Sequence, residues 1–196
     1  MKRVMVLLLL CGACSTRGTA QMAIPNDLPA LIADPRHRRE AVEAVVTRRR
    51  ELVPLLLGWF TRPPVGVDPV RFREGLILTI SEAKVSEAAP LLAENITWRP
   101  LPIPVGPVWD KPPSTIISAF PCIKALLLIG PQSVPSLLSA HARSTDPEVR
   151  LAAVFTLSQL RSPEAEAALK EILDYALTTA RFAESGLRRV GKPRAP

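Results

Sequence analysis

Few side chains in this 196-residue chain have the types and spacing that chemistry requires. The two histidines, His37 and His141, form no His-x-x-His or Glu-x-x-His pair of the kind that binds zinc. No Gly-x-Ser-x-Gly nucleophile motif and no glycine-rich phosphate loop occurs. The sequence therefore predicts no catalytic residue, no metal site and no cofactor.

The charge of the chain is concentrated at its two ends. Residues 1–20 and 181–196 together account for the whole net charge of +7, and the 160 residues between them carry 17 side chains of each sign. A nucleic-acid-binding fold spreads basic groups over its docking face, so we expect no specific nucleic-acid binding. The runs Arg36–Arg39 and Arg48–Arg50 are interpreted as solvated helix faces, offset by Glu40, Glu43 and Glu51.

The first twenty residues have the pattern of an export signal. A basic pair precedes seven consecutive apolar residues, Val4–Leu10, a stretch shorter than the roughly 20 residues that cross a bilayer. Small residues up to Ala20 suit a signal peptidase, whereas Cys11–Ser15 resembles a lipoprotein lipobox in which Cys14 would be lipidated. A buried N-terminal helix is a third interpretation. Either cleavage predicts an extracytoplasmic protein, whether periplasmic, secreted or lipid-anchored to the cell envelope.

Three segments of the chain begin in the same way, with Asp-Pro at residues 34, 68 and 146. Asp accepts hydrogen bonds from the free N–H groups at a helix start, and Pro at the first helical position gives up no hydrogen bond. The spacings of 34 and 78 residues predict a missing start near residue 110. Pro112 and Pro113 stand there, followed by Ser114 or Thr115 as the expected cap.

A second pattern, an apolar residue followed by Pro-x-Leu, marks the second half of each unit, at Pro54, Pro90 and Pro135. The fourth copy has Ala167 in place of Pro, and its helix is expected to begin earlier, at Pro163. Between the two starts, apolar residues recur every three or four positions, as in Ile117–Ile129, which holds Cys122. Each unit therefore reads as helix, turn, helix, and Cys122 as a buried, inert thiol.

Two segments carry these patterns most completely, Asp-Pro-Glu-Val-Arg-Leu-Ala-Ala-Val at 146–154 and Ala-Leu-Leu-Leu-Ile-Gly-Pro-Gln-Ser-Val-Pro-Ser-Leu-Leu at 125–138. They resemble HEAT repeats of the short bacterial type, also called PBS-lyase HEAT-like. The resemblance covers about residues 27–180 and implies an all-α, α-α superhelix (solenoid) of about four helix pairs. In such an array the second helices line a concave face that binds extended or helical partners. Repeat 1 departs from the pattern, with Arg48–Arg50 in place of Ile-Gly, and repeat 3 lacks Asp-Pro.

A proline-rich insertion at 97–114 interrupts the array, which we place at 21–180. Six of its eighteen residues are Pro, so it is not helical, and its centre is expected to be extended, near polyproline II. It forms either a binding loop or a connector that its tryptophans hold against the array. As a binding loop it would contact a partner through Trp98, Arg99, Trp109, Asp110 and Lys111.

Two functions remain from different classes. The first is an exported, non-catalytic HEAT-repeat scaffold or protein–protein interaction module, with an unknown protein partner and membrane contact only through an N-terminal lipid. The alternative is an enzyme on the same architecture, since similar repeats occur in bilin lyases and in a family of DNA glycosylases. The basic tail at 181–196, with Gly, Pro and like charges, is expected to be disordered.

Overall fold

The computed structural model describes residues 27–100 and 108–190, with side chains as far as Phe182. The expected signal peptide, Cys14, the centre of the proline-rich insertion and the last six residues lie outside the described residues. The described part is all-α, with no strand, and confirms the predicted fold class. Its α-helices are α1 (Leu28–Ala33), α2 (Arg38–Thr47), α3 (Arg49–Thr61), α4 (Pro69–Glu82), α5 (Ala89–Glu94), α6 (Pro113–Ala119), α7 (Pro121–Ile129), α8 (Val134–Arg143), α9 (Pro147–Leu160) and α10 (Pro163–Val190).

Four short 3-10 helices complete the described part: η1 (Pro35–His37), η2 (Ser86–Ala88), η3 (Val108–Asp110) and η4 (Pro131–Ser133).

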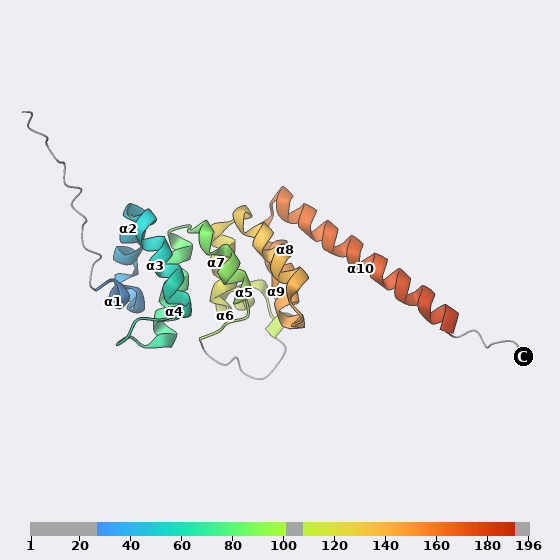
Figure 1. Ribbon diagram of the computed structural model, residues 1–196, viewed down its shortest axis with the longest axis horizontal. Coiled ribbons are helices and arrows are strands. Elements are labelled where there is room, and N and C mark those ends of the chain that lie inside the picture. The colour runs from blue at the N-terminus through green and yellow to red at the C-terminus, as the bar shows by residue number, and fades with distance from the viewer. Residues whose placement is uncertain (1–26, 101–107, 191–196) are drawn as a thin grey trace, which may run out of the picture.

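The helices stack as two layers of consecutive pairs (Figure 1). In one layer α2 contacts α4, α4 contacts α7 and α7 contacts α9; in the other α5 contacts α8 and α8 contacts α10. One apolar cluster runs through the whole stack, from Leu28 in α1 to Ala168 in α10. No single pair encloses a core of its own, because each buries its apolar side against its neighbours, as expected for a repeat array.

The three Asp-Pro segments cap helices as predicted. The carboxylate of Asp68 accepts a hydrogen bond from the backbone N–H of Arg71 at 2.8 Å, and that of Asp146 from Glu148 at 2.8 Å. Asp34 accepts from the N–H of Arg36 at 3.0 Å, but it opens the 3-10 turn η1, and α2 follows only at Arg38. The capping chemistry was therefore readable from the sequence.

The turns inside three of the helix pairs each use one residue with positive φ. Lys84 (φ +50°) ends α4, Gly130 (φ +86°) ends α7 and Arg161 (φ +47°) ends α9. Glycine adopts this region without steric cost, whereas Lys and Arg occupy it against a Cβ clash. Gly130 has ψ −148° and Arg161 has ψ +42°, so the Ile-Gly turn of the third pair differs from the left-handed turn at Arg161.

The start of the third pair differs from the prediction. Ser114 and Thr115 lie inside α6, whose N-cap is Pro112, and neither caps it. The apolar stretch Ile117–Ile129 is not one helix, because it breaks at Phe120 (φ −118°, ψ +92°) between α6 and α7. Pro121 disfavours a helical conformation for the residue before it and lacks an N–H, so the first long helix of the pair begins at Pro121.

Second-helix starts agree with the proline pattern except at Pro54. Pro90 and Pro135 occupy the first turns of α5 and α8, and α10 begins at Pro163, as expected. Pro54 lies inside α3, which starts five residues earlier at Arg49. Buried Leu52, Val53 and Leu56 hold this helix in the core and outweigh the hydrogen bond that proline removes.

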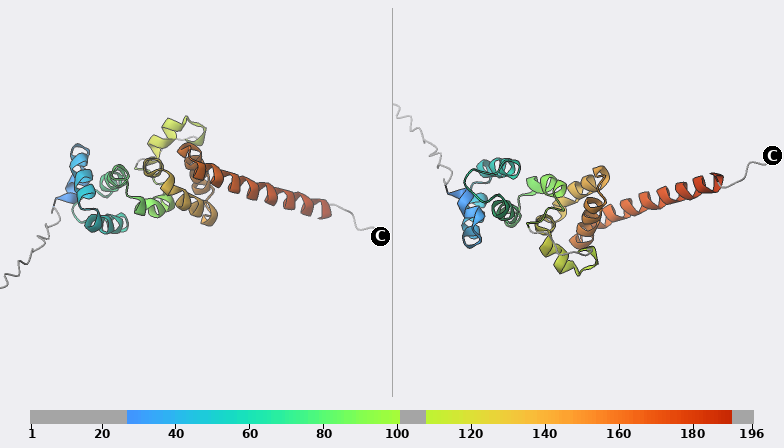
Figure 2. Two further views of the ribbon diagram at one scale, coloured as in Figure 1. Left: turned by 90° about the horizontal axis from the view of Figure 1, so that it is seen from above. Right: turned by 90° about the horizontal axis from the view of Figure 1, so that it is seen from below.

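The C-terminal tail is a second correction. Residues 181–190, expected to be disordered, continue α10 as helix to Val190, and only 191–196 lie outside the described residues. The prediction rested on the Gly, Pro and like charges of the tail. However, Ala, Leu, Glu and Arg between Thr179 and Val190 are strong helix formers, and the single Gly186 lowers helix stability by only about 1 kcal/mol. The helix extends away from the stack in every view (Figures 1 and 2).

Candidate interaction surface

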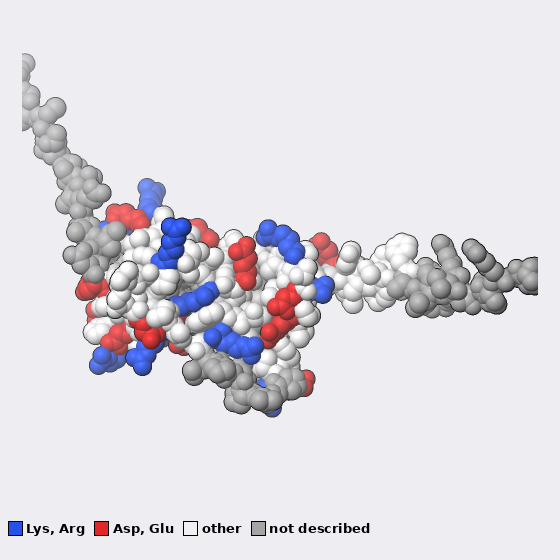
Figure 3. Space-filling model, turned by 60° about the horizontal axis from the view of Figure 1, so that its bottom comes forward, with Lys and Arg blue, Asp and Glu red and all other residues white. Residues whose placement is uncertain are grey.

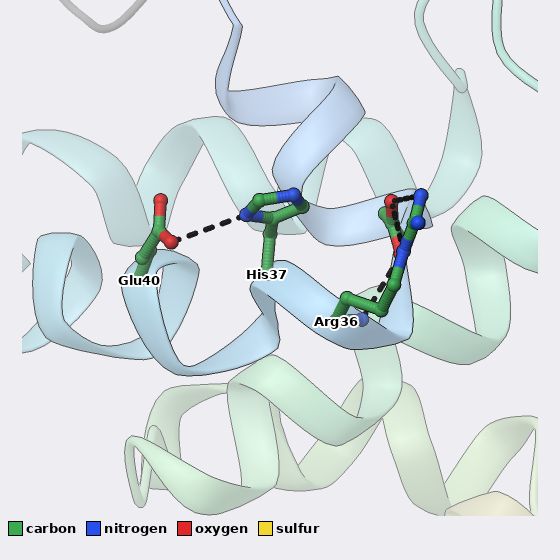
Figure 4. A network of polar contacts seen from close by, with 4 residues as sticks. Arg36, His37 and Glu40 are labelled. Atoms are coloured by element: carbon green, nitrogen blue, oxygen red, sulfur yellow. Dashed lines mark hydrogen bonds and ion pairs between the residues drawn. The ribbon is translucent and has the colours of Figure 1, made fainter.

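Three residues of the first basic run pair with acidic neighbours. Arg36 Nη2 lies 2.7 Å from Asp34 Oδ2, and His37 Nδ1 lies 3.1 Å from Glu40 Oε1 (Figure 4). The hydrogen bonds from Arg36 lower the pKa of the Asp34 carboxyl to about 2. Arg39 in the next turn pairs with Glu43. These contacts are those of a solvated helix face, as the sequence predicted.

The second basic run joins two repeats. Arg48, which lies between α2 and α3, pairs with Glu51 in the first turn of α3 at 2.6 Å. Arg49 reaches across to the next repeat, where it donates to the backbone oxygens of Ala83 and Lys84 and pairs with Glu87 at 2.7 Å. A cation at the carboxyl end of α4 also interacts favourably with the negative end of the helix dipole. This arginine therefore takes the role of an inter-repeat link in place of a ligand contact.

Lys and Arg alternate with Asp and Glu over the array face in Figure 3, and neither sign forms a continuous field. This distribution agrees with the neutral composition of residues 21–180. A polyanion needs several adjacent cations to release its counterions. The face that Figure 3 shows therefore has no phosphate-binding stripe.

The two ends of the proline-rich insertion lie against the array. The guanidinium carbon of Arg73 lies 5.0 Å from the centre of the Trp98 ring and 4.8 Å from that of Phe60. Arg73 Nη2 also donates to Asn95 Oδ1 at 2.6 Å. Burial lowers the pKa of this guanidinium, and the two rings and the amide oxygen offset that cost. Trp98 is thus half-buried in a structural contact.

Trp109 makes a similar contact at the far end of the insertion. Its ring stacks on Phe120 with centres 5.2 Å apart and meets the edge of Phe155 at 5.9 Å. Arg99 lies over Phe120 and pairs with Glu148 at 3.3 Å. The structure therefore places three of the five predicted partner-binding residues, Trp98, Arg99 and Trp109, in contacts that hold the segment against the stack.

The remaining two predicted binding residues, Asp110 and Lys111, are exposed. Asp110 is the last residue of η3, directly after Trp109, and Lys111 follows it. The partner-binding role of the insertion stays a prediction.

A hollow lies where α8, α9 and residues 171–175 of α10 meet. Its volume is about 660 Å³, and Leu138, Ile172 and Tyr175 form its apolar part. Polar groups surround them: His141 and Arg150 contribute the basic side and Glu171 the acidic side. Burial, and after it the nearby charge of Arg150, lower the pKa of His141.

Two smaller hollows continue on the other side of α8, between α8 and α5. They have volumes of about 320 and 190 Å³ and share Glu94, Ala140 and Arg143. Ser139 lines both the largest and the smallest of the three. The hollows therefore follow the second helices α5, α8 and α10, which is the face that the repeat resemblance implied for binding. Their residues were not predicted individually, because no spacing in the sequence marks a surface formed by different repeats.

The other chemical groups are structural. Cys122 is a free thiol that is fully buried in α7, and burial raises its pKa to about 12. In the described ranges no three His, Cys, Asp or Glu side chains gather as metal ligands would. Over 27–100 and 108–190 no single helix is long and apolar enough to cross a membrane; only the pair Pro121–Ile129 and Pro131–Arg143, bent by 116°, reaches that length and hydropathy together.

Comparison with known proteins gives one family. Residues 121–188, which hold α7 to α10, match the family described as HEAT repeats. No curated protein and no solved structure matches the chain. The match begins at Pro121, where the third helix pair of the structure begins. The two stacked pairs over 121–188, together with their Asp-Pro and Val-Pro helix starts, therefore support the HEAT-repeat resemblance for this part of the chain.

Proposed function

We propose that this protein is an exported, non-catalytic scaffold that binds a protein partner through the face made by α5, α8 and residues 171–175 of α10. HEAT repeats form helical interaction modules, which is the general class to which the array belongs. The observation that carries the proposal is the 660 Å³ hollow against α8. It combines apolar side chains at its centre with charges of both signs around them, the composition of a protein interface.

The shape of this face suits a helical or extended segment. Hollows lie on both sides of α8, so a partner segment crossing that helix would place apolar side chains near Leu138 and Tyr175. Its charged side chains would then meet Arg143 and Glu94 on the α5 side. In such an interface the apolar side chains at the centre favour affinity, and the charged pairs around them favour specificity.

The partner-binding part is tested by site-specific photo-crosslinking in the native host. A benzophenone amino acid replaces Ala142, an exposed residue of α8 that lines the 660 Å³ hollow. The matched control replaces Val46, an exposed apolar residue of α2 that lies in the first repeat. We expect one discrete heterologous adduct from position 142 and none from position 46. No adduct, or the same adducts from both positions, would contradict the proposed face.

Export is proposed from the basic pair and the apolar run Val4–Leu10. It is tested by fusing a reporter that needs disulfides for activity to the C-terminus, because such bonds form only outside the reducing cytoplasm. We expect an active reporter and a shortened N-terminus in mass spectrometry. Deleting residues 2–10 should abolish both. An inactive reporter on a chain that keeps residues 1–20 would support the enzyme alternative.

A further inference from the structure

Helix α10 is longer than the array needs. Its 28 residues span about 42 Å, and it points away from the stack in both views of Figure 2. Ala165 and Ala168 are buried against the fourth repeat, and Leu169 and Ile172 are partly buried there. From Leu173 onward the described side chains are exposed. The part from 173 to 190, about 27 Å long, therefore projects beyond the repeat that it completes, although Tyr175 near its start still lines the hollow beside α8.

This projecting part is not polar all round. Leu173, Tyr175 and Leu177 are 57, 74 and 48% exposed. Leu169, Leu173, Ala176 and Ala180 are spaced by four, three and four residues, and the sequence continues that spacing through positions 183, 187 and 190 with Ala, Leu and Val. Apolar residues alternating at three and four positions over three heptads are the pattern of a coiled coil.

The charge along α10 reverses from one end to the other. Residues 163–174 hold four acidic and one basic residue, whereas 175–190 hold three arginines and one glutamate. A parallel pair of these helices would place like charges together. An antiparallel pair that overlaps over 173–190 instead places Asp174 beside positions 188 and 189 of the other copy, both arginine in the sequence, which is favourable. The alanines in the middle of the stripe allow the two backbones to approach closely.

We propose that the projecting part of α10 binds the same part of a second copy of this chain in antiparallel orientation, and that the protein is a homodimer. Full overlap of 173–190 places Leu173 opposite position 190 and Ala180 opposite position 183. Each of these pairs joins an a position of one helix to a d position of the other, as antiparallel packing requires. The two arrays then lie at opposite ends of the helix pair, with the hollows between α5 and α8 uncovered.

The dimer is tested by sedimentation velocity on the full chain, with Cys11 and Cys14 replaced by serine. We expect a species of twice 21.3 kDa that dissociates on dilution and at high salt. Leu173→Glu places a charge in the stripe and should weaken dimerisation at least tenfold. The matched control Leu151→Glu changes a leucine of α9 that is 46% exposed and should have no effect. The proposal would be overturned if the chain were monomeric at every protein concentration tested, over a 100-fold range that ends at its solubility limit.

The orientation is tested with single cysteines and a short bismaleimide. In the antiparallel register the two copies of position 180 lie about 5 Å apart along the axis, and the two copies of position 173 about 25 Å apart. Ala180→Cys should therefore be cross-linked to itself and Leu173→Cys should not. Cross-linking at both positions would show a parallel pair and refute the orientation.

Two other outcomes would also overturn the homodimer. A monomer that cosediments with vesicles of anionic phospholipid would indicate that α10 binds a lipid surface. A monomer whose position 180 is cross-linked only to another protein would assign the helix to a heterologous partner. Failure of the photo-crosslink at position 142 leaves all of these results unchanged, so the two proposals fail independently.

Discussion

Replacing Gly75 by alanine should destabilise the array, although the same change in a helix is normally favourable. Gly75 lies in the middle of α4, where α1 crosses it. A Cβ atom added there would overlap the backbone oxygen of Ile32 and lie 2.9 Å from its carbonyl carbon. Since the obstacle is backbone and not the end of a flexible side chain, α1 has to move as a unit.

The magnitude follows from two opposing terms. Gly→Ala in a helix interior gains about 1 kcal/mol in backbone entropy and propensity. Overpacking costs about 1–3 kcal/mol, and a clash with backbone lies at the upper end of that range. The net loss in the free energy of unfolding should be about 1–2 kcal/mol, or roughly 2–8 °C in Tm for a chain of this size.

Gly58 supplies the matched control. It lies in α3, is exposed, and has no heavy atom within 4 Å of the added Cβ. Gly58→Ala should therefore raise Tm by about 2 °C, since only the helix term remains. Thermal unfolding followed by circular dichroism measures both variants. If Gly75→Ala raised Tm as much as Gly58→Ala does, the close approach of α1 to α4 would be wrong.

Three further predictions concern single side chains. Trp109→Ala should lower the free energy of unfolding by about 2–4 kcal/mol in urea titration, because the ring packs on the core; an unchanged midpoint would show that Trp109 is not a structural contact. NMR titration should give His141 a pKa below 6.5, moved back toward that value by Arg150→Gln. The unfolded chain then binds the proton more tightly than the folded chain does. The contribution of His141 to the free energy of unfolding is therefore present in full above pH 6.5 and is lost as the pH falls through the pKa of the folded state. The Cys122 thiol should not react with a maleimide at pH 8 until the chain is unfolded; rapid labelling of the native protein would contradict its burial.

Much of the fold was predictable because its signals are local. Asp68 and Asp146 cap their helices through atoms only two or three residues away, so the Asp-Pro pattern alone predicts where α4 and α9 start. The helical spacing of apolar residues predicts which side of each helix is buried. The errors in helix ends at Pro54 and Phe120 arose where buried neighbours or a following proline outweighed the local pattern.

The candidate binding face was predicted only in outline. The repeat pattern indicated that second helices line it, but its side chains come from α5, α8, α9 and α10, which lie far apart in the chain. The sequence suggested that the tryptophans of the insertion anchor it to the array. It did not show which surface they contact, because Arg73 and Phe120 come beside them only when the repeats stack.

The amino-acid sequence by itself determined the helix starts, the repeat unit and the neutral charge of the array, because caps, proline and periodicity act within a few residues. Tertiary structure alone decided which apolar residues stay uncovered. Leu169 and Leu173 lie one turn apart on the same side of one helix, and only the end of the stack leaves the first partly buried and the second exposed. Burial depends on what lies opposite a residue, and that is a property of the whole packed chain.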